Sequence, residues 1–156
     1  GNSGWMLRSS GNVIQFYIND GNWTGCQTSS LELNRWYHVA ATYQKGGGIA
    51  LYLDGKKVGS SSCGTLQVTP NADLQAGTAP SYSDRYMRGY IQDLSLWKDV
   101  RTAEEVAADI NCDFSGTEDG LNAYWPLNLN LGTSITDKTG NHTVNLVDVV
   151  WENPEE

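Results

Sequence analysis

The chain lacks several features that would point to a membrane or to nucleic acid. No apolar run reaches the roughly 18 residues of a membrane-spanning helix, and the opening GNSGWMLRSS lacks the basic start and apolar core of a signal peptide. Positive charge is scarce, since 10 Lys and Arg stand against 18 Asp and Glu, for a net charge of −8. Nucleic-acid affinity depends chiefly on basic side chains that neutralise phosphates, so we expect neither a membrane span nor nucleic-acid binding.

Cysteine is also scarce, and the positions of the cysteines do not decide between a disulfide and free thiols. The sequence has three, Cys26, Cys63 and Cys112, so they cannot all pair within one chain. No Cys-x-x-Cys pair or Cys/His cluster indicates a zinc site. A disulfide between Cys26 and Cys63 is one interpretation, but we favour half-buried thiols that pack as small apolar side chains.

Motifs of nucleophilic and phosphate chemistry are absent as well. The sequence contains no G-x-S-x-G elbow and no G-x-x-x-x-G-K loop. His38 lies inside the strand-like run WYHVAATY and His142 inside GNHTV, and both are interpreted as structural side chains. Nothing in these patterns predicts catalysis.

Aromatic residues and glycine are plentiful, with 6 Trp, 8 Tyr and 17 Gly among 156 residues. The aromatic residues lie in short runs in which apolar and polar residues alternate, and glycine and other turn residues separate these runs. This pattern is typical of an all-β sandwich. The clearest example lies between Trp36 and Asp54, where WYHVAATY and IALYLD flank the glycine-rich QKGGG. This pattern predicts a hairpin, and Asp54-Gly55 predicts a second turn into GKKVG.

The stretch from Trp36 to GKKVG resembles the signature of laminin G-like domains in the concanavalin A-like lectin/glucanase superfamily. The resemblance implies a two-sheet antiparallel jelly roll with one short helix, built as a single domain over residues 1–156 and cut from a longer protein. Thr102 as N-cap and Glu105 as its capping-box partner predict that helix over Thr102–Asn111. The resemblance also places three tryptophans in the core: Trp36, Trp97 and Trp125.

Further strands are predicted from WMLRSS, VIQFYI, the run around Trp23–Thr28, CGTLQVT, Leu74–Gly77 and YIQDLSLW. The tail GLNAYWPLNLNLGTSITDKTGNHTVNLV resembles the opening of such a domain, so it either starts a second repeat or completes this one. We favour completion, because its apolar side chains would be costly to expose. The predicted core comprises Val39, Ala41, Leu51, Leu53, Leu94, Leu96 and Leu127.

Glucanase relatives carry catalytic carboxylates on an E-x-D-x-x-E strand. Retaining glycosidases need two carboxyl groups about 5–5.5 Å apart, which residues at i and i+2 of one strand can supply. No two acidic residues have that spacing in this chain, so we do not expect an enzyme.

Two polar-aromatic loops are predicted to bind a ligand. Sugar recognition combines aromatic rings, which stack on sugar faces, with groups that bond hydroxyls. The first loop supplies Asp20, Asn22 and Trp23, and the second supplies Tyr82, Asp84, Arg85 and Tyr86.

A structural calcium ion is implied by the resemblance through the turn DKTGN. The expected ligands are Asp137 and Asn141 of this turn, with Gln92 from the strand YIQDLSLW. Oxygen ligands of this kind suit calcium. The alternative is an Asx-type turn without a metal.

The resulting functional expectation is a non-catalytic recognition module of a secreted or cell-surface protein of bacterial type, which binds carbohydrate. Two alternatives stay open: a protein-binding adhesion module with an extracellular protein partner, and a glycoside hydrolase-related domain without the usual catalytic carboxylates.

Overall fold

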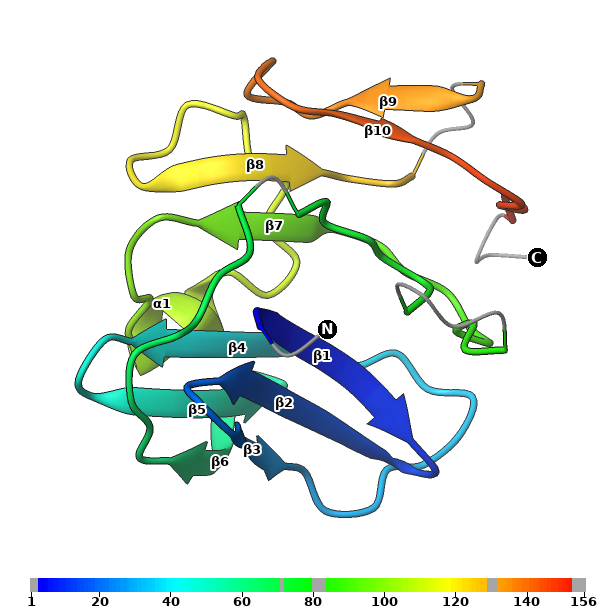
Figure 1. Ribbon diagram of the computed structural model, residues 1–156. Coiled ribbons are helices and arrows are strands. Elements are labelled where there is room, and N and C mark those ends of the chain that lie inside the picture. Colours follow the sequence, from blue (N-terminus) through cyan, green and yellow to red (C-terminus); the bar gives the residue numbers. More distant parts are fainter. Residues whose placement is uncertain (1–2, 71, 80–83, 129–131, 153–156) are drawn as a thin grey trace. The chain divides into compact units, whose positions relative to one another are not determined.

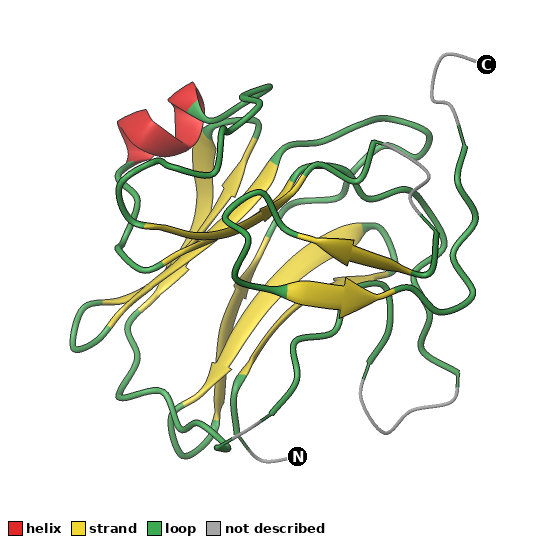
Figure 2. Cartoon of the chain, turned by 90° about the horizontal axis from the view of Figure 1, so that it is seen from above, coloured by secondary structure: helices red, strands yellow, loops and turns green. Residues whose placement is uncertain are grey.

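The computed structural model describes residues 3–70, 72–79, 84–128 and 132–152. The chain forms two compact units, unit 1 with residues 1–87 and 100–111 and unit 2 with residues 88–99 and 112–156 (Figure 1). Both units contain antiparallel strands, and one short helix occurs among the described residues (Figure 2). The prediction of an all-β fold with one short helix is therefore confirmed. No described helix has the length and apolar character required to cross a membrane.

Unit 1 contains two three-stranded antiparallel sheets, in the orders β1-β2-β3 and β4-β5-β6. Phe16 and Ile18 of β2 form one buried cluster with Ile49 and Leu51 of β5, so the two sheets of this unit share a core. Val39 and Ala41 pack against it as predicted. The strands are β1 (Trp5–Ser10), β2 (Val13–Asn19), β3 (Trp23–Gln27), β4 (Val39–Gln44), β5 (Gly48–Leu53) and β6 (Lys56–Ser61).

Helix α1 (Ala103–Ala108) also belongs to unit 1, and its start follows the sequence prediction. The Thr102 hydroxyl accepts a hydrogen bond from the Glu105 backbone N–H, and the Glu105 carboxylate accepts one from the Thr102 N–H. The predicted end at Asn111 is wrong, because the helix stops at its C-cap Asp109. The Asp109 carboxylate accepts two hydrogen bonds from one nitrogen of the Arg101 guanidinium, at 2.7 and 2.9 Å.

Unit 2 contains two antiparallel pairs. Strand β7 (Leu94–Trp97) pairs with β8 (Leu121–Trp125), and β9 (Ser134–Thr136) pairs with β10 (Thr143–Asn145). The tail thus pairs with a strand that precedes the helix. Its buried cluster comprises Ala123, Trp125 and Ile135, with Leu94, Leu96 and Leu127 packed against it.

Several local predictions are wrong. Trp36 is 51% exposed instead of buried, because β4 begins only at Val39. CGTLQVT and Leu74–Gly77 form no strand, and only Leu94–Trp97 of YIQDLSLW is a strand. The CGTLQVT segment makes isolated backbone hydrogen bonds instead of a continuous ladder. The Gln67 N–H donates to the Asn19 carbonyl, and the Gln67 carbonyl accepts from the Gly4 N–H.

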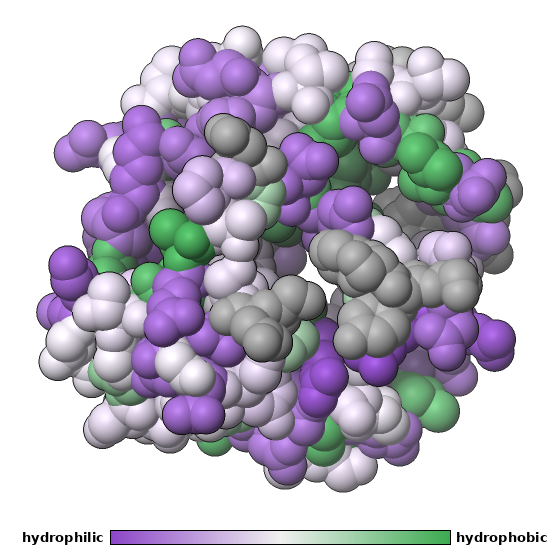
Figure 3. Space-filling view, viewed as in Figure 1, coloured by the Kyte–Doolittle hydropathy of each residue, from purple (hydrophilic) through white to green (hydrophobic). Residues whose placement is uncertain are grey.

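All three cysteines are free thiols, which agrees with the favoured interpretation. Cys26 and Cys63 are half-buried and pack against the cluster of unit 1. Hydrophilic residues cover most of the face seen in the space-filling view, and apolar residues appear there as separate patches (Figure 3).

Candidate functional site

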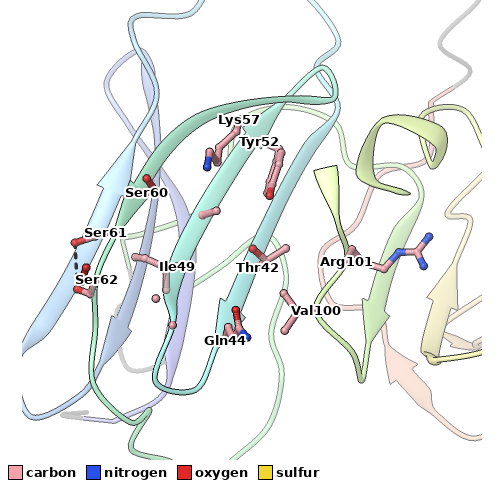
Figure 4. Close-up of a pocket in the computed structure, with 13 residues that line it drawn as sticks. Thr42, Gln44, Ile49, Tyr52, Lys57, Ser60, Ser61, Ser62, Val100 and Arg101 are labelled. Carbon is pink, nitrogen blue, oxygen red and sulfur yellow. Dashed lines mark hydrogen bonds between the residues drawn. The ribbon is translucent and has the colours of Figure 1, made fainter. Parts of the chain in front are cut away.

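An open cavity of about 470 Å³ lies over the β4–β5–β6 sheet of unit 1 (Figure 4). Side chains alternate along each strand, so Thr42 and Tyr52 project from the face opposite to the buried Leu51. Val100 and Arg101, which precede α1, line the same cavity. Its polar lining consists of Thr42, Gln44, Tyr52, Lys57 and three consecutive serines, Ser60, Ser61 and Ser62.

A β-bulge in β6 determines which side chains reach this cavity. Tyr52 pairs with Lys57, but the preceding residue Leu51 pairs with Gly59. Val58 therefore has no partner residue in β5. In a regular strand Lys57 and Ser60 would point to opposite faces, because side chains alternate. The additional residue brings both to the cavity face, which is the re-aiming that bulges produce. Val58 itself is 41% exposed.

Tyr52 stands out among the lining residues. The residue as a whole is only 7% exposed, but its hydroxyl oxygen is not one of the fully buried atoms, and no described protein group forms a hydrogen bond with it. Figure 4 shows the side chain directed over the sheet toward Thr42, within the cavity. A tyrosine hydroxyl can both donate and accept a hydrogen bond. The Tyr52 hydroxyl is therefore open to a hydrogen bond from a bound ligand.

Of the two charged residues that line the cavity, only Lys57 has no carboxylate partner among the described residues. Lys57 forms no ion pair with any described residue, whereas the Arg101 guanidinium bonds to both Asp109 and Glu105. Figure 4 shows that guanidinium pointing away from the cavity. No Asp or Glu belongs to the described residues that line it.

The first predicted loop joins β2 to β3, and Asp20 holds it in place. Its carboxylate accepts hydrogen bonds from the Gly64 N–H at 2.6 Å and from the Thr24 hydroxyl at 3.2 Å. The Gly64 bond in particular keeps the pKa of Asp20 below its ordinary value. Asn22 is exposed and Trp23 is 39% exposed, so both remain accessible to a ligand.

The second predicted loop belongs to an arm in which Thr78 and Tyr86 form an isolated bridge. Tyr86 is 66% exposed, and Asp84 and Arg85 are exposed as well. Tyr82 lies outside the described residues. Figure 1 shows this arm and the β2–β3 turn on opposite sides of unit 1, so they do not form one site.

Asp137, the expected calcium ligand, is 3% exposed and bonded by donors of the protein itself. Its carboxylate accepts hydrogen bonds from the backbone N–H groups of Tyr124, Thr139, Asn141 and His142 and from the Thr139 hydroxyl. Burial raises its pKa, but these hydrogen bonds outweigh burial and lower the pKa to about 2.

A cation does not fit this arrangement, because all five donors direct positively polarised hydrogens at the carboxylate. Gln92 is exposed and provides none of the bonds at Asp137. The side-chain nitrogen of Asn141 donates to the Thr139 hydroxyl. The geometry is that of an Asx-type turn, which was the alternative interpretation.

Comparison with known proteins identifies the family. A laminin G domain model of the concanavalin A-like lectin/glucanases superfamily matches residues 1–107. The chain belongs to this superfamily. The sequence resemblance is thereby confirmed. No protein with curated annotation matches the chain.

Two solved structures are similar to this superfamily member. One is "a putative carbohydrate binding protein" from Bacteroides ovatus, with 23% identity and a TM-score of 0.67. The match covers 95% of this chain and 50% of that one, so this chain spans half of its length. The other is an S-layer domain-containing protein from Clostridium thermocellum, with 22% identity and a TM-score of 0.46 over 69% of this chain and 57% of that one. The first likeness supports the fold.

The cavity was not predicted from the sequence. The alternation of WYHVAATY places Thr42 on the face of the strand that points away from the core. The sequence therefore contains a signal for the part of the cavity lining that β4 provides. The positions of Lys57 and Ser60 depend on the bulge at Val58. Gly59 next to it is a signal for a bulge, since an isolated glycine inside a strand pattern often marks one, but it does not show which side chains the bulge redirects.

Proposed function

We propose that this chain is a non-catalytic carbohydrate-recognition module of a secreted or cell-surface protein. The observation that carries the proposal is the cavity over β4–β5–β6, where hydroxyl and amide groups from three strands lie around the Tyr52 hydroxyl. Hydroxyls and amides both donate and accept hydrogen bonds, so they match the alternating donors and acceptors of a sugar. Ile49, Ala50 and Val100 add apolar surface for the ring carbons.

The absence of carboxylates from the described lining supports a binding role over hydrolysis. Glycoside hydrolysis requires an acid and a second carboxylate on either side of the scissile bond. Two aspartates with lowered pKa values have structural roles: Asp20 joins the β2–β3 loop to the Gly64 N–H, and Asp137 holds the β9–β10 turn through backbone N–H groups.

The predicted loop residues remain proposed additional contacts. Trp23 and Tyr86 expose aromatic rings on which a sugar face can stack. Because the two loops lie apart in Figure 1, they would contact separate parts of an extended polysaccharide.

Binding to a broad glycan array, followed by titration of the best ligand, tests this proposal. We expect binding by the wild-type chain and about three- to tenfold weaker binding by Tyr52→Phe, the effect of one lost hydrogen bond. Tyr17→Phe is the matched control, since Tyr17 lies on the other sheet of unit 1 and outside the cavity lining. Failure to bind any glycan at high protein concentration would contradict the proposal, and release of reducing ends would contradict its non-catalytic part.

A further inference from the structure

We infer that the sugar bound over β4–β5–β6 carries an anionic group, so that the ligand is an acidic glycan, in the first place one that contains uronic acid. This inference rests on the proposed function and specifies its ligand class. Two charged residues line the cavity, and Arg101 is paired with Glu105 and Asp109. The inference therefore depends on the other charge, the ammonium group of Lys57.

The position of Lys57 is fixed by the fold. Lys57 pairs with Tyr52 across β5 and β6, and Figure 4 shows the two side chains projecting from these neighbouring strands. An anionic group held by the ammonium would therefore lie within the same cavity as the Tyr52 hydroxyl. A charged acceptor strengthens the hydrogen bonds that such donors make.

The surroundings of Lys57 favour an anion in the cavity. No carboxylate belongs to the described lining, and Lys57 forms no ion pair with any described residue. The acidic groups next to the cavity wall, Glu105 and Asp109, are bonded to Arg101. With a net charge of −8, the remaining surface disfavours anions, so a cavity without acidic side chains is distinctive.

A carboxylate and a sulfate ester present the same chemistry to an ammonium group, which recognises charge without a fixed geometry. The experiment therefore uses three probes: galacturonan oligosaccharides, the same oligosaccharides as methyl esters, and sulfated galactan oligosaccharides. The esters keep the sugar rings and remove the charge, at the cost of one added methyl group on each carboxyl. We expect the wild-type chain to bind the acid form about tenfold more tightly than the ester at low salt, and the preference to shrink as salt is added.

Lys57→Gln and Lys56→Gln form a matched pair of variants. Both lysines are exposed and adjacent in β6, but Lys56 pairs with Leu53 and lies outside the cavity lining. Each variant removes one positive charge from the chain. We expect Lys57→Gln to abolish the preference for the acid over the ester, and Lys56→Gln to retain it.

The possible outcomes separate this inference from the proposed function. Equal affinity for acid and ester, or equal effects of the two lysine variants, would overturn the acidic ligand while leaving glycan recognition in place. Preference for the sulfated probe over the galacturonan would support an anionic ligand and overturn uronic acid as its source. Binding of no probe and no array glycan would overturn both the inference and the proposed function.

Discussion

At the scale of single residues, Asp137 shows what the DKTGN turn does. The side chain is almost completely buried, and its two oxygens accept hydrogen bonds from the turn itself and from Tyr124 of β8. One carboxylate therefore closes the β9–β10 turn and attaches it to a neighbouring strand of unit 2. The sequence alone predicts the turn, because Asp, Gly and Asn are turn-forming residues. It does not predict the Tyr124 donor, which only the folded chain brings near.

We expect Asp137→Asn to lower the free energy of unfolding by about 2 kcal/mol near neutral pH, since the amide accepts fewer of these bonds. The folded-state pKa of Asp137, about 2, lies below its ordinary value. The stability from the charged form is therefore complete above about pH 4 and is lost as the pH falls toward 2. Urea unfolding at several pH values should show the difference between wild type and variant shrinking on acidification.

Asp148→Asn is the control for this measurement, because Asp148 is exposed and should show no comparable loss. Melting curves with millimolar calcium and with EDTA should coincide for the wild type. A calcium-dependent rise in melting temperature that disappears in Asp137→Asn would show instead that the turn binds the ion, as the family resemblance implies.

At the scale of elements, helix α1 was predictable because its start is encoded within four residues. Thr102 and Glu105 satisfy each other's backbone N–H groups, and no distant partner is needed.

We expect Thr102→Ala to lower the free energy of unfolding by about 1 kcal/mol and the melting temperature by a few degrees. Thr102→Ser keeps the hydroxyl and should remain near wild type. Equal melting temperatures for all three proteins would show that the capping box contributes little.

Elements that depend on distant partners were predicted less well. CGTLQVT alternates as a strand does, but a strand also requires a neighbouring backbone along its whole length. Gln67 instead bonds singly to Asn19 and Gly4, while the Leu66 N–H donates to the Tyr43 hydroxyl. The same limit applies to the candidate site, since the cavity depends on how β5 and β6 align. Composition and alternation predict strands, whereas register is a property of the pair.

At the scale of the whole molecule, the two units interleave along the chain. The chain leaves unit 1 after Met87, returns at Val100 and leaves again after Asn111. No single cut therefore separates them, although each has its own buried cluster. We propose that they unfold together as one domain, as the length and motifs of the sequence predict.

Two core variants test this proposal. Leu51→Ala removes buried volume from the cluster of unit 1, and Ile135→Ala does so in unit 2. Each should cost about 2–4 kcal/mol and shift a single calorimetric transition whose van't Hoff and calorimetric enthalpies agree. Two transitions, each moved by only one of the variants, would show instead that the units are independent domains.

The bulge at Val58 makes the cavity over β4–β5–β6 sensitive to the number of residues in β6. Lys57 and Ser60 are three positions apart, so only an irregular strand lets both face the cavity. Deleting one residue here would turn the serines that follow toward the opposite face. Related domains could therefore acquire a different ligand preference through one inserted or deleted codon, with every cavity residue still present in the gene.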